Sequence, residues 1–227
     1  MDTARALIAV TACAGLLAGC SQQDEQDAAP QPDIGRVLEL KSEFGPEFKV
    51  NEVAKSGIDP AMLRQQQTPK GVTFEPPDCA KLAENQLFPP GMQGNMAAVT
   101  AEGEGNRFIV IAVETSDPVT LPDPGEQCRR VTFTGGPVKG TIEIVDTPPV
   151  PDARTLGSHR TVEVTLGGKP TSGELYSYVA AFGDYLVVVT ANPLIKPNEP
   201  VPPINDERAR NLLVAAVKAV RGEQSEQ

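Results

Sequence analysis

The sequence has few of the residues on which enzymes and metal sites depend. Its 227 residues include one histidine, His159, and four cysteines. The printed sequence contains no GxSxG nucleophile elbow, no HExxH zinc motif, no phosphate-binding loop and no dinucleotide fingerprint. We therefore expect no catalytic residue, no cofactor and no metal, and we predict that the protein is not an enzyme.

His159 leaves one catalytic alternative open. In the segment GSHRTVEV it could serve as the general base of a hydrolase. A triad would also need a nucleophile and an orienting acid around the imidazole. The competing interpretation is a histidine near the start of a strand that is hydrogen-bonded to backbone, and this is the one we expect.

The sequence also lacks a cluster of basic residues. It has 20 Lys and Arg against 30 Asp and Glu, a formal net charge of −10. Binding to nucleic acid requires a basic patch that neutralises phosphates, so we expect no nucleic-acid partner. The same negative charge disfavours electrostatic docking on anionic lipid.

The start of the chain lacks an apolar run long enough to span a bilayer. The run from Ala6 to Gly19 is interrupted by Thr11 and falls short of the roughly 20 apolar residues that a spanning helix needs. A basic Arg5, a short apolar stretch and small residues at its end are typical of a signal peptide.

Leu17, Ala18, Gly19 and Cys20 resemble the lipobox of bacterial lipoproteins. In that family a diacylglycerol is attached to the cysteine sulfur, and cleavage leaves the cysteine as the first residue. The resemblance implies a signal peptide over residues 1–19, lipidation of Cys20 and a membrane partner reached through its acyl chains. The protein would then be lipid-anchored on the extracytoplasmic face of the cell membrane. The alternative is an ordinary free or disulfide-bonded Cys20.

The composition divides the remaining chain into three parts. The stretch after Cys20 is polar and acidic and has no large apolar residue, so we expect residues 20–34 to be the lipidated cysteine and a flexible tether. We expect a single α+β domain over residues 35–222 and a disordered tail over 223–227. Two cysteines remain in the domain, Cys79 and Cys128.

We predict that Cys79 and Cys128 form a disulfide. Export would place them in an oxidising compartment, and two cysteines allow only one pairing. Closing a loop of about 50 residues would stabilise the fold by roughly 4 kcal/mol. Metal binding is the alternative, but two distant thiols and one histidine make a poor zinc set.

Period-two patterns and short apolar runs predict strands from Met96 onward. We expect them at 96–102, 107–115, 129–134, 140–146, 158–166, 174–182 and 184–191. The segment YLVVVT is apolar on both faces, as in a central strand, whereas TIEIVD and TVEVTL alternate and should each have one wet face.

Helical patterns lie on either side of these strands. Short helices are expected at 59–67 and from Asp78, and residues 36–40 fit either a short strand or a turn of helix. Residues 206–221 repeat apolar side chains at helical spacing, with Gly222 placed as the C′ residue. We therefore predict an α+β fold with a mainly antiparallel sheet, a C-terminal amphipathic helix packed on it and short N-terminal helices.

One strand offers candidate ligand-binding residues. In GELYSYVAAF, Tyr176 and Tyr178 lie on the same face, where their hydroxyls could line a cleft. We add His159 as a third candidate. The alternative is that the tyrosine rings pack under the terminal helix or against a neighbouring strand.

An ordered series of segments resembles a known family. It runs PPDC, GNMAAV, GNRFIVIAVETS, TLGSHR, ELYSYVAAFGD and RARNLLVAAVKAVR. Over roughly residues 50–221 it is similar to an uncharacterised family of mycobacterial exported lipoproteins that carries a domain of unknown function. The resemblance implies an actinobacterial cell envelope and no assigned activity.

A more distant similarity is to the extracellular sensor domains of mycobacterial Ser/Thr kinases. It implies an antiparallel sheet with helices, disulfides and a ligand cleft, although this chain has one cysteine pair and no kinase. We predict a non-catalytic binding or sensing module for a small envelope ligand or a membrane protein. The alternatives are a structural or protein-interaction lipoprotein without a ligand, and the hydrolase that uses His159.

Overall fold

The computed structural model describes residues 31–58, 71–83, 93–166, 169–196 and 199–223. The predicted signal peptide, Cys20 and the predicted helix at 59–67 lie outside the described residues. Within the described ranges, no helix combines the length and apolar character needed to cross a membrane.

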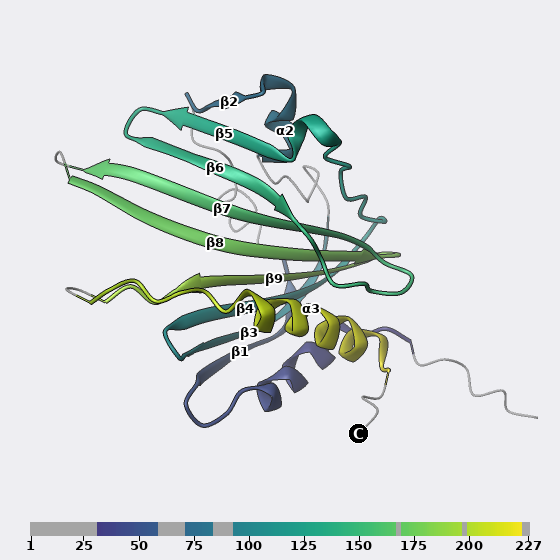
Figure 1. The fold of residues 1–227 in the computed structure, drawn as a ribbon. Coiled ribbons are helices and arrows are strands. Elements are labelled where there is room, and N and C mark those ends of the chain that lie inside the picture. The colour runs from purple at the N-terminus through teal and green to yellow at the C-terminus, as the bar shows by residue number, and fades with distance from the viewer. Residues whose placement is uncertain (1–30, 59–70, 84–92, 167–168, 197–198, 224–227) are drawn as a thin grey trace, which may run out of the picture.

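Nine strands form one antiparallel sheet in the order β1-β3-β4-β9-β8-β7-β6-β5-β2, and helix α3 lies across one face (Figure 1). The strands are β1 (Lys49–Gly57), β2 (Thr73–Glu75), β3 (Gly94–Gly103), β4 (Asn106–Thr115), β5 (Arg130–Gly135), β6 (Val138–Val145), β7 (Arg154–Leu166), β8 (Lys169–Phe182) and β9 (Tyr185–Pro193). The helical elements are η1 (Ile34–Glu43), η2 (Pro77–Cys79), α2 (Ala80–Ala83), η3 (Glu126–Cys128) and α3 (Asp206–Arg221). The predicted α+β class is confirmed.

The strands predicted from Met96 onward correspond to β3 through β9. The turn between β3 and β4 places Glu104 (φ 48°) and Gly105 (φ 76°) in the left-handed region, as a two-residue hairpin turn requires. Strand β9 lies between β4 and β8 and buries side chains on both faces, so the prediction of a central strand is also confirmed.

Two strands were not predicted from the sequence, and one segment with two predicted alternatives is resolved by the structure. Strands β1 and β2 form the two edges of the sheet and were not predicted. Residues 36–40, which fitted a strand or a helix, belong to the 3-10 helix η1. Strand β1 is exposed along almost its whole length, so it has no apolar stripe that would have marked it as a strand.

Helix α3 and η1 cover the same face of the sheet, which we call the helix-side face. The Asn205 side chain accepts a hydrogen bond from the backbone N–H of Arg208 (3.0 Å), and Gly222 ends the helix at φ 72°. The helix buries an apolar stripe against β4, β8 and β9 that consists of Ala209, Leu212, Leu213, Ala216, Val217 and Val220. The predicted terminal helix and its packing on the sheet are confirmed.

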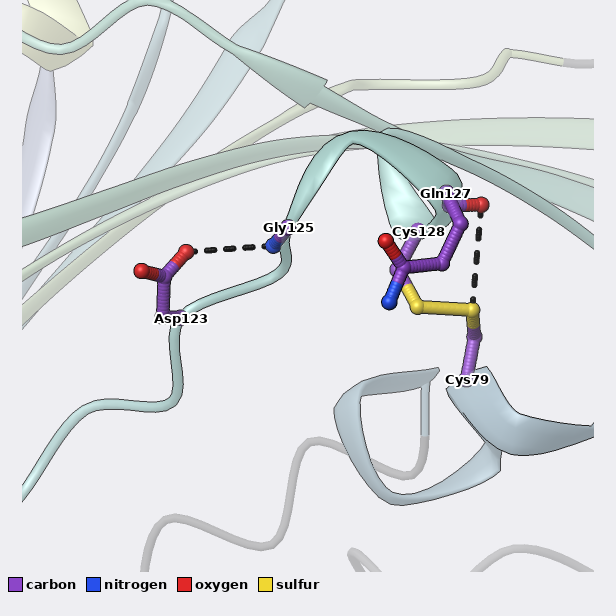
Figure 2. The surroundings of a disulfide bond; sticks show 5 residues. All are labelled: Cys79, Asp123, Gly125, Gln127 and Cys128. Atoms are coloured by element: carbon purple, nitrogen blue, oxygen red, sulfur yellow. Dashed lines mark hydrogen bonds between the residues drawn. A yellow bond between two sulfur atoms is a disulfide. The ribbon is translucent and has the colours of Figure 1, made fainter.

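The predicted disulfide between Cys79 and Cys128 is present and joins η2 to η3 (Figure 2). Its Cα atoms are 5.5 Å apart, and the carbonyl oxygen of Gln127 lies 3.8 Å from the Cys79 sulfur. Both cysteines are buried, and they pack in a cluster with Val131, Phe133 and Ile142 on the face opposite α3. The disulfide therefore fixes the short helices to the β5–β6 end of the sheet.

A buried asparagine fixes the segment that leads from β9 to α3. Asn106 is only 3% exposed, and its Oδ1 accepts a hydrogen bond from the backbone N–H of Asn205 (3.1 Å). Its Nδ2 donates to the carbonyl oxygens of Glu104 (3.1 Å) and Pro203 (3.3 Å). The end of the segment is thereby held against the β3–β4 turn.

Candidate functional site

Helix α3 covers only part of the helix-side face. Its main contacts with the sheet are to β4, β8 and β9, while β7, β6, β5 and β2 continue beyond it (Figure 1). We call the helix-side face of these four strands, together with residues 169–175 of β8, the open half. Side chains on this half alternate with those of the disulfide cluster on the other face.

The sheet splits beside the open half. Strand β8 pairs with β9 from Tyr176 opposite Ala191 to Phe182 opposite Tyr185, and its earlier residues pair with β7. Strand β9 instead follows β4 until Pro193 lies opposite Asn106. Figure 1 shows the ends of β8 and β9 diverging on the side of the β7–β8 hairpin.

A groove of about 650 Å³ lies over the open half at this split. Pro193 and Val201, from the end of β9 and the segment after it, form one side. The floor consists of two cross-strand rows that run over β5, β6, β7 and β8. One row is Thr132, Thr141, Thr161 and Glu174, and the next is Thr134, Lys139, Glu163 and Ser172.

The floor is rich in hydroxyl groups. Threonine or serine supplies five of the eight side chains in the two rows. Neighbouring strands lie about 4.8 Å apart, so a row of four side chains extends over roughly 14 Å. At the outer edge, Thr73 Oγ1 lies 3.1 Å from Thr134 Oγ1, which continues the second row onto β2.

The three charged side chains of the floor have polar partners. Lys139 Nζ lies 2.9 Å from Glu163 Oε1, within the second row. Glu174 Oε2 lies 3.2 Å from Nε2 of His159, which belongs to the next row toward α3. The groove therefore offers hydroxyls and paired charges to a ligand.

The predicted ligand-binding residues lie beside the groove and do not line it. The rings of His159 and Tyr176 stack with centroids 4.2 Å apart and planes at 14°. Tyr176 and Tyr178 continue the stack, with centroids 6.3 Å apart and planes at 11°. The three rings form a ladder that leads from Glu174, at the inner edge of the groove, to the start of α3.

Tyr178 packs under the terminal helix, as the alternative interpretation held. The side chain is 1% exposed, and its hydroxyl lies in the electrostatic field of Asp206, the first residue of α3. Burial, and then the negative charge of Asp206, raise the pKa of Tyr178 to about 12. Tyr176 is half-buried, and burial followed by the Asp206 charge also raises its pKa.

The sequence signalled the groove residues only in part. The alternation in TIEIVD and TVEVTL predicted wet faces that include Thr141, Thr161 and Glu163. It did not show that the strands would align these residues with Thr132 and Ser172, because neighbouring rows depend on long-range register.

The hydrolase alternative requires a nucleophile beside His159. Its ring lies between Glu174 and Tyr176, and Ser158 points to the opposite face of β7 because neighbouring strand residues alternate. In the part of the chain that the structure describes, no three His, Cys, Asp or Glu side chains gather as a metal site.

The fold and the site define an α+β domain with a single, partly covered antiparallel sheet. Residues 33–221 match a domain of unknown function, DUF5642, and the chain belongs to this family. It is similar to an uncharacterised protein from Mycobacterium smegmatis, an ortholog of Rv0999, whose X-ray structure is known. The two are 59% identical with a TM-score of 0.79, over 86% of this chain and 100% of the other.

The extracellular domain of PknH from Mycobacterium tuberculosis is more distantly similar. The identity is 13% and the TM-score 0.38, over 83% of this chain and 92% of that domain. No protein of curated function matches the chain. The predicted membership of a mycobacterial domain family of unknown function is confirmed.

Proposed function

We propose that the protein is a non-catalytic binding module, held at the outer face of a membrane by lipidated Cys20, and that the groove is its ligand site. The observation that carries the proposal is the combination of a hydroxyl-rich floor with an apolar side in one hollow of about 650 Å³. A flat sheet face exposed to water would have no apolar side wall, whereas this groove has Pro193 and Val201. Hollows of this size are typical of small-molecule sites.

The environment of His159 supports a non-catalytic role. Its Nε2 is directed at Glu174, a hydrogen-bond acceptor, and its ring lies flat on Tyr176. With Nε2 engaged by Glu174, only Nδ1 could take a proton from a nucleophile, and among the described residues no hydroxyl or thiol is hydrogen-bonded to the ring. The histidine thus helps to hold Glu174 at the edge of the groove.

The position of the groove supports a site directed away from the anchor. The backbone N–H of Asp33 donates to the carbonyl oxygen of Val220 (2.7 Å), so the segment that leads from Cys20 joins the fold at the C-terminal end of α3. The aromatic ladder begins near the N-terminal end of α3, at Asp206, and leads to the groove. The helix between them has 16 residues and is therefore about 24 Å long.

Native mass spectrometry of the full chain, purified from a mycobacterial host, tests the proposal. We expect a reproducible bound mass in addition to that of the acyl chains. Thr161→Trp places an indole on the exposed floor and should abolish the bound mass. The control is Thr171→Trp, which changes an exposed threonine of the same hairpin on the opposite face and should leave the bound mass intact.

If the wild-type protein carries no mass beyond that of the acyl chains, the ligand site is contradicted. The second candidate, a protein-interaction lipoprotein, is then favoured. The observation that favours this candidate is β1, an exposed edge strand of nine residues that pairs with β3 on one side. Edge strands present backbone groups to which another chain can add. Crosslinking at the membrane, mapped to β1, would support it.

A further inference from the structure

The chemistry of the groove narrows the class of ligand. Each threonine or serine hydroxyl can donate one hydrogen bond and accept others, and carboxylates accept only. The two rows therefore offer donors and acceptors side by side for roughly 14 Å. A ligand that uses such a floor must itself carry donors and acceptors along its length.

The pairing of charges disfavours an ionic ligand. The cation that lines the groove, Lys139, is engaged by Glu163 at 2.9 Å, and Glu174 by His159 at 3.2 Å. A phosphate or sulfate site relies on basic groups directed at the anion, often as bidentate pairs. A cationic ligand would compete with Lys139 and His159 for the same two carboxylates.

The apolar side of the groove adds a second requirement. Val201 is 53% exposed, and with Pro193 it faces the hydroxyl rows across the split. The methyl groups of the threonines add apolar surface within the floor. A ligand with C–H faces as well as hydroxyls matches both sides.

The direction of the groove decides between a ligand on the face and a strand added in the plane of the sheet. An extended peptide that joined the free edge of β8 would lie beside β8 and contact mainly that strand. The groove instead runs over β5, β6, β7 and β8. Its occupant lies across the strands.

We infer that the groove binds a neutral, polyhydroxylated chain, that is, a carbohydrate, laid across β5 to β8. Sugar hydroxyls contact the threonine and glutamate rows, and sugar C–H faces contact Pro193 and Val201. The row length exceeds a single sugar ring, so an oligosaccharide is the expected unit. This inference rests on the proposed function.

An array of neutral oligosaccharides (glucans, mannans, galactans and arabinans), with phosphorylated counterparts, tests the inference on the full chain. We expect binding to at least one neutral class. Calorimetry with that oligosaccharide then compares Thr161→Val, which removes one hydroxyl and keeps the β-branched shape, with wild type. Loss of one hydrogen bond should weaken binding by about threefold to tenfold.

Thr171→Val is the matched control on the opposite face and should bind like wild type, and circular dichroism checks that both variants fold. If Thr161→Val and Thr171→Val have the same affinity for the oligosaccharide, the proposed site is overturned. Tighter binding of the phosphorylated sugars would overturn the neutral ligand. Binding of no glycan, while native mass spectrometry finds a bound mass that Thr161→Trp abolishes, would overturn the carbohydrate and leave the proposed function standing. If the protein binds no glycan and carries no bound mass, both the carbohydrate inference and the proposed function are overturned.

Discussion

Tyr178 links the terminal helix to the edge of the groove. Its ring is buried under α3 next to the Asp206 charge, and it stacks toward Tyr176 and, through Tyr176, His159. Each ring in this ladder limits the rotation of the next, and the last one contacts Glu174. If the groove binds a ligand as proposed, such a fixed edge would reduce the ordering that the ligand must impose.

The raised pKa of Tyr178 predicts a loss of stability at high pH. In the unfolded chain the phenol ionises near its ordinary pKa of about 10, whereas in the fold it holds its proton to about 12. Between these values the unfolded state has lost the proton and the folded state has not, so the free energy of unfolding decreases as pH rises. The contribution, of order 2 kcal/mol, is complete below pH 10 and is lost as pH approaches 12.

Urea unfolding at intervals across this window measures the effect. Tyr178→Phe removes the ionisable group, so its stability should decrease less steeply than that of wild type. Tyr176→Phe is the control, because it keeps Tyr178 and should retain most of the slope. Parallel pH curves for wild type and Tyr178→Phe would show that Tyr178 does not cause the decrease.

Among the elements, the short helices η2 and α2 depend most on a single covalent link. They join η3 through Cys79 and Cys128, and they lie next to β2, the short edge strand. The disulfide closes a loop of 49 positions, for which the chain-entropy model gives a stabilisation of about 4 kcal/mol. We expect the double variant Cys79→Ser and Cys128→Ser to lose up to that amount.

Urea unfolding of the oxidised protein, the reduced protein and the double variant checks this prediction. The reduced protein and the double variant should agree, since both lack the link. Hydrogen exchange should increase first at β2 and at the start of β5, near the disulfide. Equal unfolding midpoints for oxidised and reduced protein would contradict the prediction.

Elements with a buried stripe could be predicted from the sequence, and elements without one could not. Helix α3 repeats apolar residues at helical spacing between Asn205 and Gly222, and β9 is apolar on both faces, so local pattern was sufficient. Strand β1 has almost no buried side chain, and β2 has three residues. Their pairing partners, not their own residues, make them strands.

The candidate site shows the same limit. The wet faces of β6 and β7 were predicted, because alternation is a local property. The groove also requires the register of four strands and the divergence of β8 from β9 past Tyr176. These depend on contacts between distant segments, and for this reason the sequence pointed to Tyr176 and Tyr178 and missed the threonine rows.

Under the proposed function, the whole molecule would have an anchor end and a binding end. The segment from the predicted anchor joins the fold beside Val220, and the groove lies past the other end of α3. With a net charge of −10, the chain gains little from anionic lipid, so attachment would depend on the acyl chains. A tether of 13 residues, Ser21 to Asp33, could extend to about 45 Å. This arrangement would separate the groove from the attachment point by the length of α3, while the flexible tether would leave the domain free to turn.

Cys20→Ala tests the anchor separately from the groove. Without the thiol no diacylglycerol can be attached, so the protein should move from the membrane fraction to the soluble fraction and lose the mass of the acyl chains. Binding in the groove should be unchanged, because Cys20 precedes the fold and the groove lies at the far end of α3. Ser21→Ala, the neighbouring control, should stay in the membrane fraction. If Cys20→Ala stays in the membrane fraction, the lipid anchor is excluded. If Cys20→Ala leaves the membrane and also loses the bound ligand, the groove functions only at the membrane.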